Sequence, residues 1–250
     1  MPRYFIEVSY KGTVYSGFQV QQNAVTIQSE VEKALKIYYR QHFTLTGSSR
    51  TDAGVHAFQN YFHFDIDIAF EENSIEVYNL NAILPKDIVI KRIFLVERNT
   101  HCRFDAIKRE YKYFIYQNKN PFLLDRAYYF PYSLDINKLN EAAESLLQHK
   151  DFTSFSKKNT QVNNYICNLK KSEWIVDKDT LIYNVESNRF LRGMVKGLVG
   201  TMLRVGTHKI SLNQFSDIIY GRDCSNADFS VPSHALFLIK VSFNNIKNFE

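Results

Sequence analysis

The order of two hydrophobic periodicities constrains the fold of this chain more than any other feature of its sequence. Apolar and polar residues alternate over positions 4–10, which is the period of a half-buried strand. Over 26–41 the apolar residues recur every three or four positions, and we predict a helix there with Thr26 as its N-cap. Strands are predicted at 43–46 and 57–67. This order predicts an α+β fold with helices on one face of its sheet.

The same two periods continue to the end of the sequence. Further helices are predicted at 73–84, 136–148, 189–205 and 212–220, and further strands at 88–96, 111–116, 165–176, 181–186 and 236–243. Both halves therefore mix strands and helices in similar proportions, although no sequence repeat relates them. We expect one α+β half over 1–105 and a second over 106–250.

The composition is that of a globular protein with a mild basic excess. The chain has 250 residues, of which 45% are hydrophobic, and this is enough to bury a sizeable core. Lysine and arginine number 31 against 26 aspartates and glutamates, a formal charge of +5. This excess fits a polyanionic partner without requiring one, because many basic proteins bind no nucleic acid.

The cysteines indicate neither a disulfide framework nor a zinc site. Cys102, Cys167 and Cys224 are odd in number, widely spaced and outside any C-x-x-C pair. We therefore expect a reducing, cytoplasmic location. We also expect no export signal and no membrane anchor, because no apolar run is long enough to cross a bilayer.

The segment 48–56, Ser-Ser-Arg-Thr-Asp-Ala-Gly-Val-His, lies between two predicted strands and contains the most informative carboxylate of the chain. In one interpretation Asp-Ala-Gly is only a turn, with Asp52 capping a backbone N–H and Gly54 at positive φ. Local sequence alone favours this interpretation.

Two catalytic interpretations of the same segment remain open. Ser48 or Ser49 can act as a nucleophile with His56 and Asp52 as partners, although the strained Gly-x-Ser-x-Gly turn of such enzymes is not visible. Alternatively, Asp52 is a lone nucleophile or acid/base in a basic groove. That role needs a cation to keep the carboxylate ionised and an aromatic ring to fix the substrate.

The predicted helix at 189–205 can supply the cation. Arg189, Arg192 and Lys196 lie at i, i+3 and i+7, so on a helix they would share one face. Three glycines belong to the same predicted helix: Gly193, Gly197 and Gly200. Because a glycine in a helix costs roughly 1 kcal/mol relative to alanine, three of them indicate that another backbone comes close.

A second polar group superficially resembles a set of metal ligands. His63, Asp65 and Asp67 alternate on one predicted strand, but no fourth ligand or Cys/His cluster accompanies them in the sequence. We interpret them as a solvent-facing strand edge and predict no metal.

Five stretches of the sequence resemble a known family, the tRNA pseudouridine synthases of the TruA type. They are YKGTVYSGFQVQQ at 10–22, RTDAGVH at 50–56, NAILPKDI at 81–88, HCRFDAIKREYKY at 101–113 and FLRGMVKGLVGTMLRVG at 190–206. They occur in the order typical of the family and span nearly the whole chain, and PSHALFLIKV at 232–241 resembles its closing strand. RTDAGVH is the most specific of them.

The resemblance implies two pseudo-equivalent α+β halves around a continuous, mostly antiparallel sheet, with a basic cleft between them and two chains forming an active homodimer. It also implies isomerisation of uridine to pseudouridine in the anticodon arm of tRNA, typically at positions 38, 39 and 40. An isomerisation changes no net oxidation state and transfers no group to another molecule, so no cofactor is expected.

The resemblance also assigns roles to residues of this chain. Asp52 is implied to be the nucleophile that helps break the N-glycosidic bond, and Arg50 matches the arginine linked to extruding the nucleotide, a step that such chemistry requires. Tyr111 matches the tyrosine that stacks on the target base. Lys196 is implied to pair with Asp52. The other two cations of the predicted helix are expected to bind substrate: Arg189 and Arg192.

The chain departs from the family pattern at three places. Lys196 stands where the family usually has arginine, and lysine keeps the charge but lacks the bidentate fork. Ser48 and Ser49 stand where glycine is usual, and 160–169 lacks a common arginine-rich run. The departures at Ser48–Ser49 and at 160–169 bear on substrate range more than on reaction type. Lys196 and Ser49 leave open an alternative, a catalytically inactive tRNA-binding protein on the same scaffold, which would bind RNA with a salt-dependent affinity.

Overall fold

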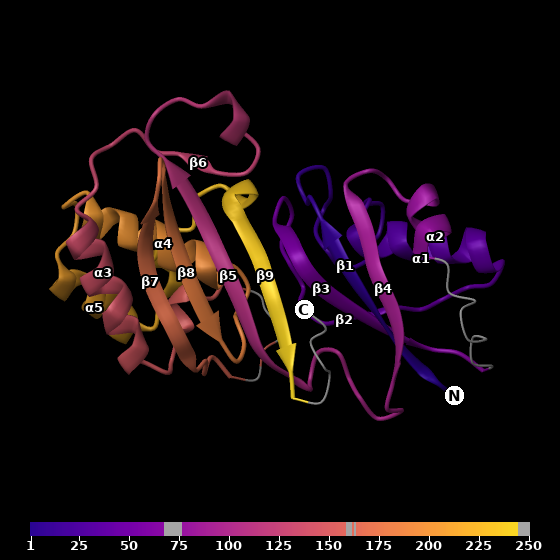
Figure 1. The fold of residues 1–250 in the computed structure, drawn as a ribbon. Coiled ribbons are helices and arrows are strands. Elements are labelled where there is room, and N and C mark those ends of the chain that lie inside the picture. Colours follow the sequence, from indigo (N-terminus) through magenta and orange to yellow (C-terminus); the bar gives the residue numbers. More distant parts are fainter. Residues whose placement is uncertain (68–76, 159–161, 163, 245–250) are drawn as a thin grey trace. The chain divides into compact units, whose positions relative to one another are not determined.

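The computed structural model describes residues 1–67, 77–158, 162 and 164–244. The chain forms two compact units, the first made of 1–107 with 238–250 and the second of 108–237 (Figure 1). Among the described residues, no helix is both long and apolar enough to span a membrane.

The strands of the first unit form an antiparallel sheet. Strand β1 (Arg3–Tyr10) pairs with β3 (His56–Asp65) on one side and with β4 (Ile88–Val96) on the other. The short β2 (Thr46–Gly47) also pairs with β3. The end of β9 (Leu236–Phe243) returns to this unit, where the Val241 amide donates to Gln59 Oε1 at 3.1 Å.

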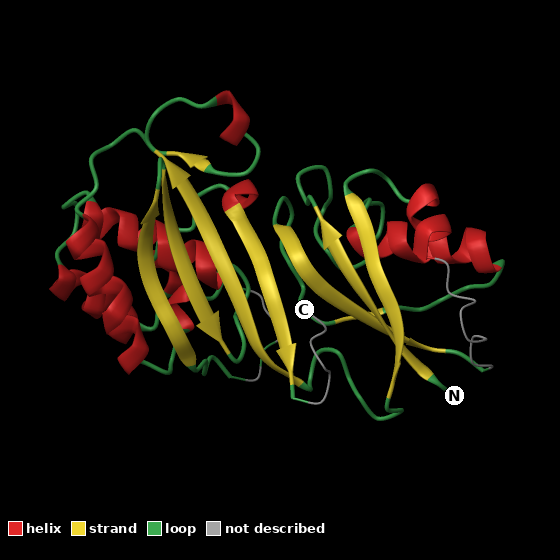
Figure 2. Cartoon of the chain, in the orientation of Figure 1, coloured by secondary structure: helices red, strands yellow, loops and turns green. Residues whose placement is uncertain are grey.

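Two helices lie on one face of this sheet, α1 (Ile27–Tyr39) and α2 (Val77–Ile83) (Figure 2). Thr26 caps α1 as predicted, because its hydroxyl oxygen accepts from the Ser29 amide at 3.1 Å and Ser29 Oγ accepts from the Thr26 amide at 2.9 Å. The buried face of α1 has the predicted spacing. It is formed by Ile27, Gln28, Val31, Ala34 and Leu35.

The second unit has its own antiparallel strands and its own helices. Strand β8 (Thr180–Ser187) pairs with β5 (Ala106–Tyr116) and with β7 (Leu169–Asp177), and β6 (Tyr128–Tyr129) pairs with β5 in parallel. Three helices lie on one face of these strands (Figure 2): α3 (Ile136–Ser145), α4 (Met194–Gly206) and α5 (Leu212–Gly221). Short 3₁₀ turns complete the unit at Pro121–Leu123, Leu146–Gln148, Thr153–Phe155, Cys224–Asn226 and Ser233–Ala235.

The predicted α+β class is confirmed, and so is the mostly antiparallel pairing. The strands at 88–96 and 236–243 have the predicted bounds. The predicted helix at 73–84 is observed from Val77, and positions 73–76 lie outside the described residues. The continuity of the sheet from one unit to the other and the basic cleft between them remain predictions.

Several predicted bounds differ from the observed ones, and for two elements the structure shows the reason. The strand expected at 43–46 begins only at Thr46, because side chains of α1 satisfy the backbone of Leu45: Glu32 Oε1 accepts its N–H at 3.0 Å and Gln28 Nε2 donates to its carbonyl at 2.8 Å. The helix expected from 189 begins at Met194, because its N-cap Gly193 has a φ of 75°. A left-handed residue there ends any continuous helix.

Candidate active site

The segment 48–56 leaves β2 and enters β3 through a tight turn. The Val55 amide donates to the Asp52 carbonyl at 3.2 Å, and Gly54 takes a φ of 80°. The hydrogen bond that closes this turn thus uses the backbone of Asp52. Arg50 is exposed and the Asp52 side chain is half-buried, whereas Thr51 between them is buried.

A buried asparagine holds the start of this segment. Asn60, on β3, is fully buried. Its Oδ1 accepts from the Ser49 amide at 3.2 Å, and its Nδ2 donates to the Ser49 carbonyl at 2.8 Å. Oδ1 also accepts from the Tyr61 amide at 2.9 Å, and Nδ2 also donates to Tyr10 Oη at 3.0 Å. All the hydrogen-bonding capacity of this side chain is used, so it fixes the backbone just before Arg50.

Tyr10 extends this network to the other side of Arg50. Its Oη shares a hydrogen bond of 2.7 Å with Thr51 Oγ1, and burial raises the pKa of the phenol above its ordinary value. Tyr10 therefore remains neutral at physiological pH. The residues on both sides of Arg50 are thus held by uncharged, buried groups, while the arginine side chain stays exposed.

Two glycines of the stretch at 10–22 allow another part of the chain to approach this loop. A Cβ atom at Gly12 would overlap the carbonyl oxygen of Val55, and one at Gly17 would lie 3.2 Å from the carbonyl oxygen of Thr51. Gly17 also has a φ of 103°. The neighbouring Phe18 amide donates to the Thr51 carbonyl at 3.1 Å. The segment after β1 therefore braces the loop that carries Asp52.

The geometry does not support a serine nucleophile. Both Ser48 Oγ and Ser49 Oγ are buried and have no hydrogen-bond partner within the described structure. His56 is buried as well, and its Nδ1 accepts from the Gly12 amide at 3.0 Å. A serine activated by His56 requires a hydrogen bond between the two side chains, so the hydrolase interpretation is wrong.

In the second unit, Tyr111 is buried on β5 and packs against an aromatic neighbour. The ring of Phe190 lies edge-on to it, with the centroids 5.0 Å apart and an interplanar angle of 82°. Phe190 belongs to the segment between β8 and α4, which thus lies beside Tyr111 within one unit.

The three predicted cations do not form a helical face, and this prediction is wrong. Arg189 and Arg192 precede the start of α4, and only Lys196 lies on the helix, in its first turn. Arg189 Nη1 donates to Asn164 Oδ1 at 3.2 Å. Lys196 is half-buried, with its Nζ 3.4 Å from Ser233 Oγ.

Two glycines of α4 do allow the close approach that the sequence indicates. A Cβ atom at Gly200 would overlap the carbonyl oxygen of Asp228, and one at Gly197 would lie 2.7 Å from the ring of Phe229. Gly193 serves differently, as the left-handed N-cap. Gly197 and Gly200 therefore allow α4 to pack closely against the segment around Asp228, in agreement with the prediction of close packing.

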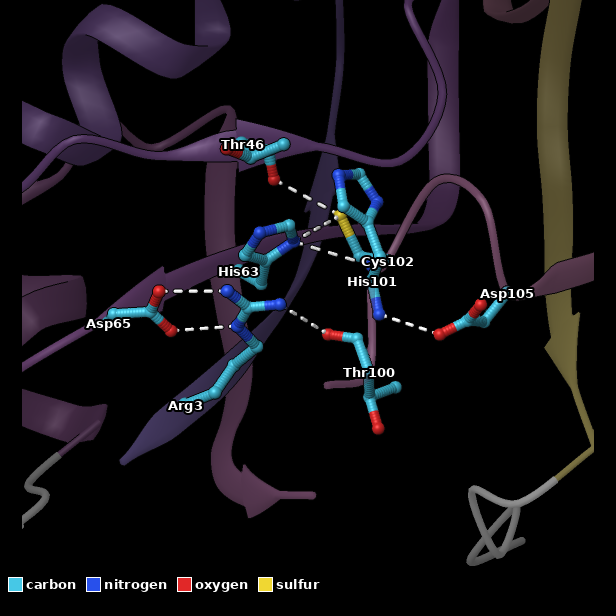
Figure 3. Close-up of polar contacts among 8 residues, drawn as sticks. All are labelled: Arg3, Thr46, His63, Asp65, Thr100, His101, Cys102 and Asp105. Atoms are coloured by element: carbon cyan, nitrogen blue, oxygen red, sulfur yellow. Dashed lines mark hydrogen bonds and ion pairs between the residues drawn. The ribbon is translucent and has the colours of Figure 1, made fainter. Parts of the chain in front are cut away.

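A cluster that the sequence did not reveal connects β3 with the loop after β4 (Figure 3). His63, His101 and Cys102 each offer one potential metal-ligand atom, and the three atoms lie within 4.8 Å of one another. His63 is buried, so its interpretation as part of a solvent-facing edge is wrong. Asp65, beyond it, instead forms a bidentate ion pair with Arg3, at 2.7 and 2.8 Å.

Hydrogen bonds occupy the thiol of Cys102 and the Nδ1 atom of each histidine in this cluster. Cys102 Sγ donates to the Thr46 carbonyl at 3.1 Å, and His63 Nδ1 accepts from the Cys102 amide at 3.3 Å. His101 Nδ1 accepts from the amides of Arg103 at 3.1 Å and Phe104 at 3.3 Å, so its Nε2 carries the proton. A histidine that ligates a metal usually donates from its other nitrogen. The donor set therefore fits an anchor for the loop better than a metal site.

Sequence patterns marked Arg50, Asp52 and Tyr111 but not the side chains that hold them. Asn60 and Tyr10 look like ordinary strand residues. The signal that could have found them is the placement of a polar residue on the apolar face of a predicted strand.

Comparison with known proteins gives a consistent result. A family model described as tRNA pseudouridine synthase matches residues 6–105 and 142–244. The chain is 40% identical over 245 residues to tRNA pseudouridine synthase A of Azobacteroides pseudotrichonymphae genomovar. CFP2, covering 98% of each protein. It is 41% identical over 246 residues to the Bacteroides fragilis protein of that name, covering 96% of each.

A more distant relative agrees. The chain is 34% identical over 241 residues to tRNA pseudouridine synthase A of Staphylococcus aureus strain MRSA252, covering 96% of this chain and 91% of that protein. The residues that the family model matches include the loop at 48–56 and helix α4. The chain belongs to the tRNA pseudouridine synthase family.

Proposed function

We propose that this protein isomerises uridine to pseudouridine in the anticodon arm of tRNA, at positions 38, 39 and 40, with Asp52 as the nucleophile. Membership of the family supports the reaction and the substrate class. The geometry that best supports the role of Asp52 is its loop, which buried hydrogen bonds hold at Ser49 and Thr51. A nucleophile must be held at a fixed position relative to the reacting carbon, and such a loop provides this.

In the proposed reaction, the bond between N1 of the base and C1′ of the ribose breaks and a bond between C5 and C1′ forms. N1 gains a proton and C5 loses one, so substrate and product are isomers. Asp52 supports the cleavage and the reattachment. Arg50, exposed beside it, takes the place of the extruded nucleotide in the RNA.

The second unit supplies the other proposed groups. Tyr111 stacks on the target base, and its packing on Phe190 fixes the plane of its ring. Lys196 pairs with the Asp52 carboxylate. A cation in the first turn of a helix opposes the helix dipole, and a carboxylate partner would offset that cost. Arg189 and Arg192 bind phosphates of the RNA beside α4.

The proposal includes the cellular setting of the enzyme. We place its activity in the cytoplasm, where tRNA is the substrate, and the three free cysteines fit a reducing compartment. We propose an active homodimer without a cofactor. The halves would then have different tasks, the first carrying the Asp52 loop and the second carrying Tyr111 and α4.

The proposal is tested by mapping pseudouridine in unmodified tRNA after incubation with purified protein. We expect product in the anticodon arm with the wild type and, for Asp52→Asn, a loss of at least about a thousandfold in rate. Asp67→Asn, which changes an exposed carboxylate of the same unit, should retain the wild-type rate. Robust product formation by Asp52→Asn would exclude this nucleophile. Binding of tRNA without any modification by the wild type would favour the inactive-scaffold alternative.

A further inference from the structure

A hollow of about 180 Å³ opens beside Arg50, within the first unit. The apolar part of its lining includes Phe18 and Leu45. Arg103 and Phe104 also line it. Small-molecule sites usually measure about 300–1,000 Å³, so this hollow suits one flat ring better than a whole cofactor.

The Phe104 ring at the edge of the hollow is exposed but not loosely placed. It is 73% exposed, and its centroid lies 4.3 Å from that of His101. His101 in turn lies edge-on to His63, with the centroids 4.6 Å apart. Because the Phe104 amide also donates to His101 Nδ1 at 3.3 Å, the exposed ring is connected to the buried part of β3 through two imidazoles.

The charge around the hollow favours an anion. Arg50 and Arg103 both line it, and none of the described residues in its lining is acidic. The Arg103 guanidinium carbon lies 5.6 Å from the centre of the Phe104 ring. An exposed aromatic ring beside a cation is the arrangement that binds unpaired nucleotides, since the ring stacks on the base and the cation attracts the phosphate.

We propose that this hollow binds a second nucleotide of the tRNA substrate, distinct from the target uridine, with its base stacked on Phe104 and its phosphate beside Arg103. This inference rests on the proposed function, which assigns the target base to Tyr111. The position of Arg50 at the same hollow links the two steps. The nucleotide held on Phe104 would keep the RNA in place while Arg50 occupies the gap left by the target.

The test measures tRNA affinity in the Asp52→Asn background, so that it does not depend on turnover. We expect Phe104→Ala to weaken binding about tenfold and Phe104→Trp to keep the wild-type affinity. The matched control is Phe122→Ala, which removes a similarly exposed phenylalanine (80%, against 73% for Phe104) in the second unit. Thermal unfolding should show all three variants folded, because the side chains changed are exposed.

A second set of affinity measurements distinguishes the contribution of the stacked base from that of the phosphate. Arg103→Gln should reduce the slope of log affinity against log salt by about one, while Phe104→Ala should leave that slope unchanged. Equal affinity for Phe104→Ala and Phe122→Ala would overturn the inference even if the wild type modifies tRNA. Failure of the wild type to modify tRNA would instead overturn the proposed function, so the two failures are distinguishable.

Discussion

Two loops of the first unit each present an exposed arginine to the same hollow, but they are held by different chemistry. The loop of Arg50 is held by an amide and a phenol, Asn60 and Tyr10, which stay neutral over the physiological pH range. The loop of Arg103 is held by His63 and His101, whose ring nitrogens accept backbone N–H groups. An imidazole can accept at that nitrogen only while it is unprotonated there. The hydrogen bonds that Asn60 and Tyr10 make on either side of Arg50 therefore do not change with pH near neutrality, whereas those that His63 and His101 accept are lost when the imidazoles are protonated.

The largest expected effect comes from a substitution that disrupts the packing of the segment after β1 against the Arg50 loop. In Gly12→Ala the new methyl group overlaps the Val55 carbonyl, so both backbones must shift. We expect a loss of about 3 kcal/mol in the free energy of unfolding, together with a fall in the pseudouridylation rate at temperatures where the variant is folded. Denaturant unfolding and a rate assay measure the two effects.

Gly221→Ala is the control for this substitution. No atom lies within 4 Å of a Cβ there, and the residue ends α5. Its free energy of unfolding should be unchanged or raised by up to about 1 kcal/mol. Equal stability of the two variants would contradict the proposed bracing of the loop.

A slightly smaller effect tests whether the hydrogen bonds of Asn60 position the catalytic loop or only stabilise the unit. Asn60→Ala leaves the buried Ser49 amide and carbonyl without their partner, so we expect a loss of about 2 kcal/mol in stability. Asn81 makes the same pair of bonds to Ile90, both at 2.8 Å, away from the loop. Asn81→Ala should be destabilised comparably. Only Asn60→Ala should also lower kcat, and similar kcat values for the folded variants would refute the positioning role.

The smallest expected effect is a pH dependence of stability, which arises from His63 in the support of the Arg103 loop. Burial, with the charges of Arg3 and His101, lowers the pKa of His63 to about 4, although Asp65 opposes this. In the unfolded chain the imidazole of His63 is therefore protonated below about pH 6.5, whereas in the folded chain it is protonated only below about pH 4. Because only the unfolded chain binds this proton, the free energy of unfolding should fall as the pH drops through this interval. His63→Gln, which cannot titrate, should show a shallower slope between pH 6.5 and 4. Identical slopes would show that His63 does not control the second loop.

The sequence predicted those elements whose hydrophobic period matches their burial. Strand β4 and helix α1 are examples, because each has one apolar face packed in its unit. It failed where backbone geometry or a distant side chain decides the outcome. The start of α4 depends on the left-handed Gly193, and the absence of a strand at Leu45 depends on Glu32 and Gln28.

The residues of the candidate site likewise divide into those that the sequence predicted and those that only the structure identified. Arg50 and Asp52 were predicted because their short motif is specific, whereas Asn60 was missed because its partners lie 11 and 50 residues away in the chain. A polar residue on an apolar strand face signals that some partner exists. Only the tertiary structure identifies that partner, as the pairing of Cys102 with Thr46 also illustrates.

The return of β9 to the first unit has a consequence for synthesis of the protein. Phe243 packs its ring against Phe5 and Tyr61, with centroids 5.5 and 5.3 Å apart, and Val241 binds Gln59 across 182 positions. The unit that carries Asp52 therefore stays incomplete until residues 238–243 have left the ribosome. Because closing so long a loop precedes the contacts that stabilise it, this unit should be the last to acquire its native order, although its sequence is translated first.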